Sequence, residues 1–406
     1  MLNAGITGVR GYAAVHHQQI ARLENAGRVS LKSVVVPTVG GSVDASAEDL
    51  AGLETRGVTR FESLESMISD GPDLDVVFLP VGIPLHHRFS IQCLEAGINV
   101  VCEKPLAGSV SQADDMIKAR DRTGKRLVIG YQHMYHPAID FIHGLRASNA
   151  YGRLKRADTL VLWPRDTAYF TRNRWAGRFM VDGVHVRDCP LNNACAHFMQ
   201  NMLFVTYALS GIPRDIRVVR ADNFRSASIE TADTQDTEAE GPDGERLRMM
   251  VTHACETNSN AFAVYQFEDK HVYWLQEGLV FVADAEATPR FSDREALRDA
   301  ASTGAYGVHA VYDGSTFDVN RTAFDSIVDG LANGTELQSE VQYCRAHTSI
   351  VEQALPDGTA VEKMPQTELR VRTPSDGSPV HQAVRPGIEE AARRAFCGNR
   401  PLTHEL

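Results

Sequence analysis

The chain has 406 residues, of which 43% are hydrophobic and 23% are charged, and its formal net charge is −11. This composition is typical of a globular protein of two domains, and the acidic balance argues against nucleic acid as a partner because no basic stripe remains to neutralise phosphates. No apolar run approaches the roughly 20 residues of a membrane span, so no membrane partner is expected. Seven cysteines without a Cys-x-x-Cys pair favour a cytoplasmic localisation.

The stretch that begins at Ala4 has the layout of a strand, a tight glycine turn and a helix. In such a turn the backbone of Gly8, Val9, Arg10 and Gly11 would hold a dinucleotide pyrophosphate at the N-terminus of the helix. Arg10 stands where a second close-approach glycine is often found. It is therefore either a phosphate contact or a solvated turn residue.

The second expected strand, residues 31–36, should end with an acid that holds the ribose 2′-hydroxyl of NAD, or with a basic residue for the 2′-phosphate of NADP. Neither follows this strand directly. Asp44 is the nearest acid, and its distance along the sequence makes it a poor substitute. The choice between NAD and NADP therefore stays open.

Strands and helices alternate regularly over the first third of the chain. Further strands are expected at residues 74–81, 98–102 and 126–131, and helices at residues 63–69 and 111–123 and in a segment ending at residue 97. This alternation predicts a doubly wound parallel sheet, a Rossmann domain, over residues 1–136.

An acid, a base and a proline follow the expected strand 98–102 directly: Glu103, Lys104 and Pro105. Ligands of open parallel sheets bind at the carboxyl ends of the strands, so these side chains would stand beside a cofactor and substrate. Pro105 favours an extended conformation of Lys104 and would fix its direction. The alternative is a strand-end ion pair beside a turn proline.

The glycine turn, the spacing of Pro84 and His86 before Gly97, and the Glu103–Pro105 stretch resemble the glucose-fructose oxidoreductase/inositol dehydrogenase (Gfo/Idh/MocA) family. Residues 128–137 resemble the last strand of that family's N-terminal domain. The resemblance implies an oxidoreductase that uses NAD or NADP and acts on sugars, polyols or related alcohols. In that case Lys104 is catalytic, Glu103 helps to hold the cofactor, and Val81, Pro84 and His86 are further cofactor-binding candidates.

After Pro137 the pattern changes to longer strands without intervening helices. These strands are expected at residues 154–163, 216–223, 247–253, 261–267 and 272–281. Their spacing predicts a C-terminal α/β domain, residues 137–406, with a large, mainly antiparallel open sheet that binds substrate and builds a homodimer or homotetramer. Residues 228–245 hold seven acids and no base and are expected to be a solvated loop.

A helix is expected from Pro190 to Gly211, with Asn193 and His197 one turn apart on one face. The resemblance would place an Asp-x-x-x-His pair here, facing the nicotinamide, and this chain has an amide in place of the acid. We expect His197 to be the general acid/base and Lys104 to polarise the reacting oxygen, although the reverse assignment is also possible. Asn193 can hold a hydroxyl but cannot take a proton.

Asp188 either replaces the missing acid or caps this helix. Further substrate-contacting candidates are Tyr131, Arg165, Arg174, Trp175, Asp188 and Asn192. Aromatic faces and guanidinium groups suit sugars and sugar carboxylates. No metal is expected, because the spacing of the nearby histidines, cysteines and acids matches no standard zinc pattern.

Three functions are compatible with these features. The first is an NAD(P)-dependent dehydrogenase or reductase that moves a hydride between nicotinamide and a secondary alcohol or ketone of a sugar, cyclitol or sugar acid. The second is cofactor-assisted cleavage of a glycoside through transient oxidation. The third is a non-catalytic regulator that binds dinucleotide or sugar, which the altered glycine turn and Asn193 favour, and which the presence of both Lys104 and His197 disfavours.

Overall fold

The computed structural model describes residues 1–39, 42–209, 211–214, 216–286, 291–372 and 379–406. The chain divides into two compact units. The first unit contains residues 1–135 and 318–345, and the second contains residues 136–317 and 346–406. None of the helices in the described ranges combines the length and the apolar character needed to cross a membrane.

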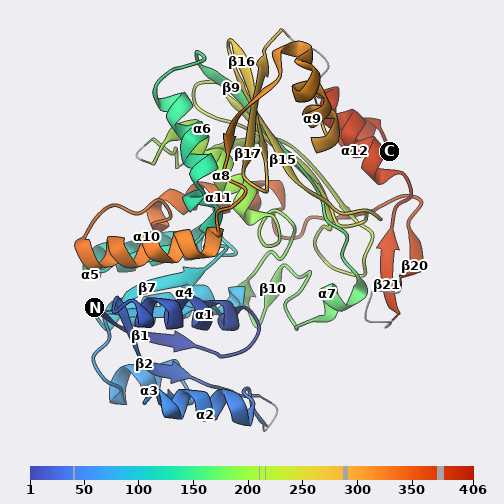
Figure 1. Cartoon of the computed structure of the whole chain (residues 1–406). Helices are drawn as coiled ribbons and strands as arrows, with labels where there is room; N and C mark the ends of the chain where they lie inside the picture. The colour runs from blue at the N-terminus through green and yellow to red at the C-terminus, as the bar shows by residue number, and fades with distance from the viewer. Residues whose placement is uncertain (40–41, 210, 215, 287–290, 373–378) are drawn as a thin grey trace. The chain divides into compact units, whose positions relative to one another are not determined.

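The first unit is built on a six-stranded parallel sheet (Figure 1). In spatial order its strands are β5 (Thr59–Phe61), β2 (Val29–Val35), β1 (Leu2–Thr7), β6 (Val76–Leu79), β7 (Asn99–Glu103) and β8 (Leu127–Gly130). In chain order this is 3-2-1-4-5-6, the Rossmann order. The predicted doubly wound sheet is confirmed.

Local sequence signals set the ends of the helices of this unit. The helices are α1 (Tyr12–Asn25), α2 (Ala47–Thr55), α3 (Leu64–Asp70), α4 (Ile83–Glu95), α5 (Val110–Thr123) and α10 (Val319–Asn333), with a 3-10 turn η1 (Gln132–Tyr135). The side chains of Ser63 and Ser109 cap α3 and α5 by accepting backbone N–H bonds. Gly124 ends α5 in the left-handed conformation, with φ 65°.

Residues 318–345 return to the first unit, whereas the expected boundary placed everything after residue 136 in the second domain. The Ile129 amide donates to the Ser339 carbonyl at 2.8 Å, and Arg126 Nε donates to Glu340 Oε1 at 2.7 Å. On α10, Phe324 stacks on Phe78 of β6 with ring centroids 5.8 Å apart. These partners are about 200 residues apart along the chain, so no local pattern reveals them.

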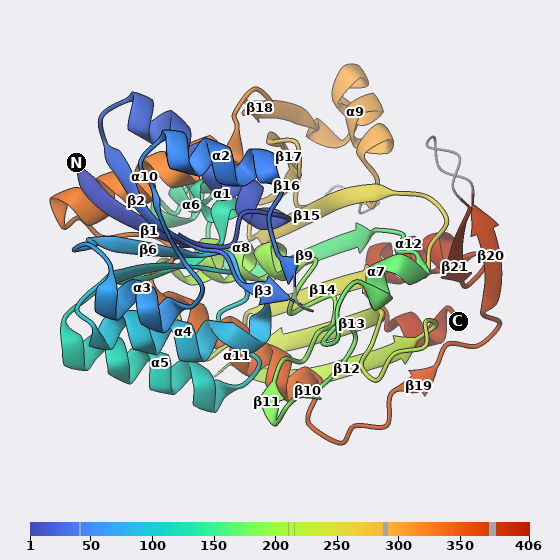
Figure 2. The ribbon, with the colours of Figure 1, turned by 90° about the horizontal axis from the view of Figure 1, so that it is seen from below.

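The second unit is built on a nine-stranded sheet, whose strands lie side by side in Figure 2. Their order is β18 (His309–Asp313), β17 (Leu279–Asp284), β16 (Lys270–Leu275), β15 (Ser259–Phe267), β9 (Leu154–Leu162), β14 (Arg246–Thr252), β13 (Thr234–Glu240), β12 (Arg217–Arg225) and β19 (Glu362–Lys363). Only the β9–β14 and β12–β19 pairs are parallel. The predicted mainly antiparallel sheet is therefore confirmed.

Helices cover this sheet and complete its core. They are α6 (Pro137–Ala147), α7 (Thr167–Thr171), α8 (Ala196–Tyr207), α9 (Arg294–Thr303), α12 (Ile388–Cys397), η2 (Ala305–Gly307) and η3 (Leu402–His404); α11 (Val341–Ala354) spans the boundary between the units. One large apolar cluster joins Phe262, Tyr273 and Phe281 of the sheet to Ile388 and Phe396 of α12. Each such buried side chain contributes roughly 1.5–3 kcal/mol to stability.

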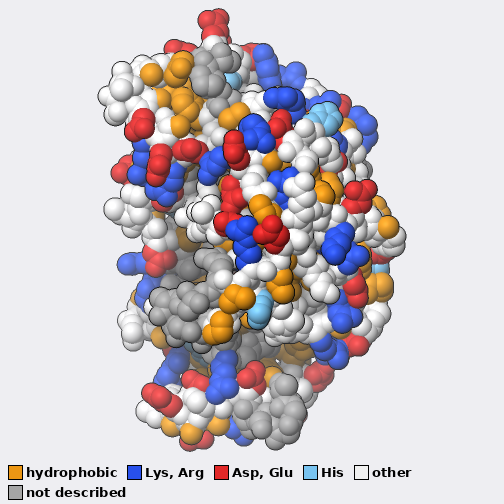
Figure 3. All heavy atoms as spheres, turned by 90° about the vertical axis from the view of Figure 1, so that its right-hand side faces the viewer, with side chains coloured by type: hydrophobic (Ala, Val, Ile, Leu, Met, Phe, Trp, Pro, Cys, Tyr) orange, Lys and Arg blue, Asp and Glu red, His pale blue; other side chains and the backbone are white. Residues whose placement is uncertain are grey.

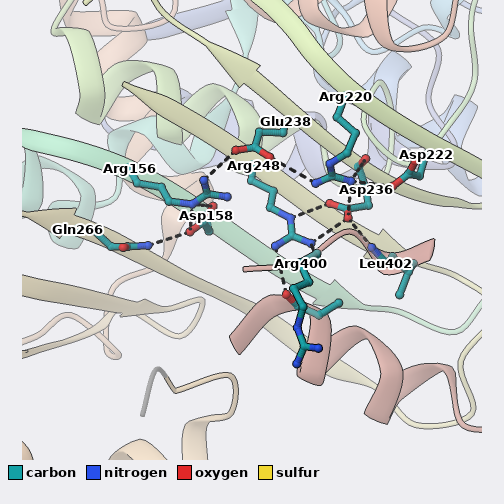
Figure 4. A network of polar contacts seen from close by, with 11 residues as sticks. Arg156, Asp158, Arg220, Asp222, Asp236, Glu238, Arg248, Gln266, Arg400 and Leu402 are labelled. Carbon is teal, nitrogen blue, oxygen red and sulfur yellow. Dashed lines mark hydrogen bonds and ion pairs between the residues drawn. The ribbon is translucent and has the colours of Figure 1, made fainter. Parts of the chain in front are cut away.

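The acidic stretch 228–245 is not a solvated loop, and that prediction was wrong. It contains β13, in which Asp236 is fully buried. Arg248 of β14 donates to both Asp236 carboxylate oxygens at 2.8 Å, and Arg220 of β12 donates to one of them at 2.7 Å (Figure 4). Although burial alone raises the pKa of a carboxyl, these hydrogen bonds hold the pKa of Asp236 below its ordinary value.

The single strand expected at residues 272–281 is two strands, β16 and β17. The Gly278 amide donates to the Leu275 carbonyl at 2.8 Å, and Gly278 has φ 95°, which favours glycine. Residues 275–278 thus form the turn of a hairpin. The remaining strands are the small hairpins β3 (Thr38–Val39) with β4 (Ser42–Val43), β10 (Met180–Val181) with β11 (Val184–His185), and β20 (Glu368–Arg372) with β21 (Val380–Val384).

Candidate active site

The glycine turn lies between β1 and α1 in the first unit. Gly8 and Gly11 have φ of 79° and 61°, and the Gly8 amide donates to the Val35 carbonyl at 2.7 Å. Among the described residues no side chain caps the start of α1, and nothing lies within 4 Å of a Cβ added at Gly11. A glycine turn at a helix N-terminus that no side chain caps fits a pyrophosphate. Val9 is buried, so its backbone rather than its side chain would take part.

Arg10 and Asp44 lie together at this turn. Arg10 Nη1 is 3.8 Å from Asp44 Oδ1, and Arg10 Nε is 3.8 Å from Asp49 Oδ2. The Asp44 amide donates to the carbonyl of Pro37, two residues beyond the end of β2, at 3.0 Å. The β3–β4 hairpin therefore brings Asp44 back to the strand end, although the sequence suggested that it was too far away.

Glu103 is the hub of a buried polar cluster at the carboxyl end of β7. Its Oε1 accepts hydrogen bonds from His16 Nε2 at 2.9 Å and Gln132 Nε2 at 2.8 Å, and its Oε2 accepts from the Lys104 amide at 3.2 Å. Burial raises the pKa of a carboxyl, but the hydrogen bond and charge of His16 and the charge of Lys104 outweigh it and hold the pKa of Glu103 low. An added Cβ on Gly130 would lie 2.8 Å from Glu103 Oε1, so a glycine is needed there.

His86 joins two loops at this edge of the sheet. Its ring nitrogens lie 2.7 and 3.0 Å from the carbonyl oxygens of Pro105 and Val81. The ring is fully buried, and burial lowers the pKa of His86. The side chain expected to bind cofactor thus positions the Lys104–Pro105 segment instead. Pro84 lies in the first turn of α4.

Tyr131, expected to contact substrate, is fully buried inside the first unit. Its hydroxyl bonds to the Leu106 backbone, and burial raises the pKa of Tyr131 well above 10. A side chain without exposed surface does not reach a substrate. Tyr131 is therefore a packing residue, and that prediction was wrong.

In the second unit, Asp188 and Asn193 form a hydrogen-bonded pair. Asn193 Nδ2 donates to Asp188 Oδ1 at 2.6 Å, and the Gly177 amide donates to Asp188 Oδ2 at 2.7 Å. The helix α8 begins only at Ala196, with Cys195 at its N-cap. Asn193 therefore lies in the preceding turn rather than one helical turn from His197, and Asp188 does not cap the helix. The prediction for Asn193 was wrong, and the alternative of a helix cap is ruled out for Asp188.

Aromatic rings and guanidinium groups alternate next to this pair. The Arg165 guanidinium lies over Trp163 and Tyr169, 5.5 and 4.9 Å from their ring centroids. Arg172 lies 3.9 Å from the Tyr169 centroid and 5.1 Å from that of Trp175, and its Nη2 is 3.5 Å from Asp188 Oδ2. Such a stack presents flat apolar faces beside hydrogen-bond donors, the combination that sugar rings require.

The same cluster contacts α8. Trp163 packs edge-on against Phe198 of α8, with ring centroids 5.6 Å apart, and Phe198 directly follows His197 in the sequence. Burial, together with the charge of Asp188, raises the pKa of Tyr169 to about 12. The structure thus brings Arg165, Trp175, Asp188 and Asn193 into one contiguous cluster.

Two of the expected substrate-contacting residues, Arg174 and Asn192, lie outside this cluster. Arg174 is 72% exposed and pairs with Asp182 at the β10–β11 turn. Asn192 is fully buried, and its Nδ2 donates to the Val186 carbonyl at 3.0 Å. Arg172, two positions from Arg174, occupies the place expected for the latter.

Sequence reasoning missed His16, Gln132, Tyr169 and Arg172. His16 had a visible signal, because it shares the buried face of α1 with Ala13, Ile20 and Leu23 at helical spacing. Gln132 had a weaker one, since it follows a strand end. Tyr169 and Arg172 had none, because α7 is a short helix within a long connection.

A buried histidine behind this cluster makes the second unit sensitive to acid. The ring of His253 lies 2.7 Å, through Nδ1, from the Trp163 carbonyl. Burial, helped by the charge of Arg165, lowers the pKa of His253 to about 3. The unfolded chain takes up this proton near pH 6.5 and the folded chain only near pH 3, so stability falls as the pH falls between these values.

We expect His253 to account for about 2 kcal/mol of the stability lost between pH 7 and pH 5. Urea unfolding followed by tryptophan fluorescence at both pH values measures this loss, and His253→Gln should reduce it by that amount. The exposed His404, as His404→Gln, is the control and should leave the pH dependence unchanged. An equal pH dependence in all three proteins would contradict the assignment.

Within the described ranges no group of three or more His, Cys, Asp or Glu residues is placed to hold a metal ion.

The sheet order, the glycine turn and the acid-base pair at a strand end define a dinucleotide-binding α/β protein. Residues 2–131 match the GFO_IDH_MocA family model, described as "Oxidoreductase family, NAD-binding Rossmann fold". The match confirms the predicted resemblance to the Gfo/Idh/MocA family over this part of the chain. The match also supports a nicotinamide dinucleotide as the cofactor.

Curated relatives match over short lengths. An uncharacterized oxidoreductase of Rhizobium meliloti is 35% identical over 95 residues, which are 23% of this chain and 28% of the relative. The trans-1,2-dihydrobenzene-1,2-diol dehydrogenase of Xenopus tropicalis is 26% identical over 32% of this chain and 42% of its own length. The inositol 2-dehydrogenase of Mycolicibacterium smegmatis is 27% identical over 37% of this chain and 42% of its own length. The chain thus matches less than half the length of these relatives.

Solved structures share the fold over most of the chain. The WlbA dehydrogenase of Bordetella pertussis, in complex with NADH and UDP-GlcNAcA, has a TM-score of 0.66 at 20% identity and covers 88% of this chain and 97% of its own. A levoglucosan dehydrogenase in complex with NADH and levoglucosan has a TM-score of 0.67 at 16% identity. The match covers 87% of this chain and 97% of the levoglucosan dehydrogenase chain.

Proposed function

We propose that the chain is an NAD(P)-dependent oxidoreductase that transfers a hydride between nicotinamide and a secondary alcohol or ketone of a sugar, cyclitol or sugar acid. The family match of residues 2–131 supports the cofactor class. The names of the relatives and fold neighbours, which include an inositol and a levoglucosan dehydrogenase, support the substrate class.

One observation carries this proposal: the His16–Glu103–Gln132 cluster. His16 is on the helix that follows the glycine turn, Glu103 ends β7, and Gln132 follows β8. The cluster fixes the backbone of Lys104 at the edge where a parallel sheet binds its ligand. A buried carboxylate with three donors is costly to build for packing alone, since an apolar group would need no partners.

A bound dinucleotide would supply the hydride acceptor or donor. In this proposal Lys104 polarises the reacting oxygen of the substrate, and His197 takes or returns the proton at a ring nitrogen. The Asp188–Asn193 pair holds a substrate hydroxyl, with the Asn193 amide kept in one orientation by the Asp188 carboxylate. The rings of Tyr169 and Trp175, which both contact the Arg172 guanidinium, exclude water from one face of the sugar.

We further propose NAD rather than NADP as the cofactor. Asp44 lies beside the end of β2 and next to Arg10 of the glycine turn, where its carboxylate would accept the ribose hydroxyls. A 2′-phosphate there would meet the negative charges of Asp44 and Asp49, and Arg10 is already paired with both. Like charges at this distance disfavour NADP.

Titration of the purified chain with NADH and NADPH, followed by nucleotide fluorescence, tests both proposals. We expect saturable binding with NADH preferred, and about tenfold weaker NADH binding for Asp44→Asn, because a hydrogen bond to a charged group is lost. The exposed Asp73, as Asp73→Asn, is the control. If neither nucleotide binds at submillimolar concentration, and none is released on denaturation, the oxidoreductase proposal is wrong; if binding occurs without any effect of Asp44→Asn, only the NAD assignment is wrong.

Two further expectations remain proposals. The chain would work in the cytoplasm, as its cysteine content favours. It would form a homodimer or homotetramer through the open face of the nine-stranded sheet. Analytical ultracentrifugation measures the oligomeric state.

A further inference from the structure

A separate pocket of about 590 Å³ lies within the second unit. Three segments form its walls: α7 with the residues before it, the loop between β12 and β13, and the β20–β21 hairpin with residues leading to it. Figure 1 shows α7 next to β21. The side chains of Tyr169 on α7 and of Arg172 directly after it belong to the cluster around Asp188, whereas Phe170 and Thr171 line this pocket.

Hydrogen bonds hold the walls in place. Thr167 Oγ1 donates to the His381 carbonyl at 2.8 Å, which ties α7 to β21. The buried Asp233 accepts the Ser226 and Ala227 amides at 2.7 Å each and fixes the β12–β13 loop. The pocket is therefore formed before any ligand arrives, which lowers the entropic cost of binding.

Positive charge in this pocket is not balanced by the protein. Arg165 and Lys363 line it, and within the described part of the chain neither makes an ion pair with a carboxylate. Arg165 Nε is buried and has no hydrogen-bond acceptor among those residues. The one acid of the lining, Asp166, already accepts the Tyr169 amide at 2.9 Å as the cap of α7. In a chain of net charge −11, two uncompensated cations in one pocket favour an anionic ligand.

Apolar surface accompanies these cations. Phe170 and Leu369 line the pocket, and Leu369 is 70% exposed. Figure 3, which looks onto the side where the hairpin lies in Figure 1, shows small hydrophobic areas among interspersed acidic and basic side chains. A ligand that covers Leu369 would remove apolar area from water while its charge meets Arg165 and Lys363.

We propose that this pocket binds an organic anion, a molecule in which a phosphate or carboxylate group is joined to a flat or apolar ring. The anion pairs with Arg165 and Lys363, and the ring packs against Phe170 and Leu369. The Ser226 hydroxyl on the pocket wall, which accepts from Thr367 Oγ1 at 3.3 Å, supplies a further donor. This site lies within the second unit and does not depend on the dinucleotide function proposed above.

Calorimetric titration of the full chain with phenyl phosphate, with NADH in excess to occupy the glycine turn, tests the proposal. One molecule should bind per chain at submillimolar concentration, and at least tenfold more tightly than benzyl alcohol or inorganic phosphate. Arg165→Gln and Lys363→Gln should each weaken binding about tenfold, and Leu369→Ser several-fold. Lys155→Gln, an exposed cation paired with Glu268 outside the pocket, is the matched control.

Absence of binding, or equal binding by the wild type and the Lys363→Gln variant, would overturn the proposal. Lys363 is exposed, so its replacement tests the site even if Arg165→Gln does not fold. Two sources could supply such a ligand: the charged end of the substrate or a separate effector. Turnover of glucose, glucuronate and glucose 1-phosphate distinguishes them, since only a substrate subsite gives a preference for the charged sugars that Lys363→Gln abolishes.

Discussion

Lys104→Met is expected to lower kcat by 10²–10⁴-fold, the range typical of a group that stabilises charge or moves a proton in the transition state. The Kd for NADH should change less than threefold, because His16 and Gln132 still hold Glu103 in this variant. A screen of polyols and sugars supplies the substrate, and stopped-flow fluorescence of NADH measures both quantities. Lys118→Met, which replaces an exposed lysine on α5, should have no effect.

The pH profile of the same variant separates the two possible assignments of the proton carrier. If His197 takes the proton, kcat/KM of Lys104→Met still rises with pH, because only the neutral imidazole accepts a proton. If Lys104 takes it, that limb is lost in Lys104→Met and retained in His197→Ala. A kcat within threefold of the wild type in both variants would remove both residues from the mechanism and favour the regulator function.

Arg248→Met is expected to destabilise the second unit by about 3–5 kcal/mol, because it leaves the fully buried Asp236 carboxylate without its bidentate partner. Arg248 also donates to the Arg400 carbonyl at 2.7 Å, while the Leu402 amide donates to Asp236 at 3.0 Å (Figure 4). The network therefore attaches the C-terminal segment to β13 and β14, and its loss should loosen that segment as well.

Urea unfolding followed by tryptophan fluorescence measures this effect, since Trp163, Trp175 and Trp274 all belong to the second unit. The control is Arg217→Met on β12 of the same sheet. The Arg217 side chain is exposed and pairs with Glu240 at 3.1 Å, so we expect a change below about 1 kcal/mol. A similar small change for Arg248→Met would show that the network does not hold the unit together.

Most of the first unit could be predicted from its sequence because the relevant signals are local. The buried strands, the Ser63 and Ser109 caps and the Gly8–Gly11 turn each depend on residues within one or two turns of the chain. Once strands and helices alternate, the connection rules leave few sheet orders. The position of Lys104 at a strand end followed from the same local pattern.

The candidate site could be predicted only in part. His197, Asn193, Asp188 and Arg165 were proposed from residue type, spacing and the family resemblance. The start of α8 was not predicted, because the turn at residues 190–195 has helix-like spacing without a regular helix. Arg172 and Arg174 were indistinguishable in sequence. Only their ion-pair partners distinguish them: Arg172 pairs with Asp188, and Arg174 pairs with Asp182.

The sequence by itself determined the parallel sheet, the glycine turn and the acid-base pair at the end of β7, since each depends on the conformational preferences of neighbouring residues. The tertiary structure decided which distant groups meet. A hairpin places Asp44 beside the end of β2. The acidic stretch forms a buried strand because Asp236 pairs with Arg248 and Arg220. The physical reason is that a buried charge is tolerated only beside its partner, and the identity of that partner is fixed by strand pairing and not by local sequence.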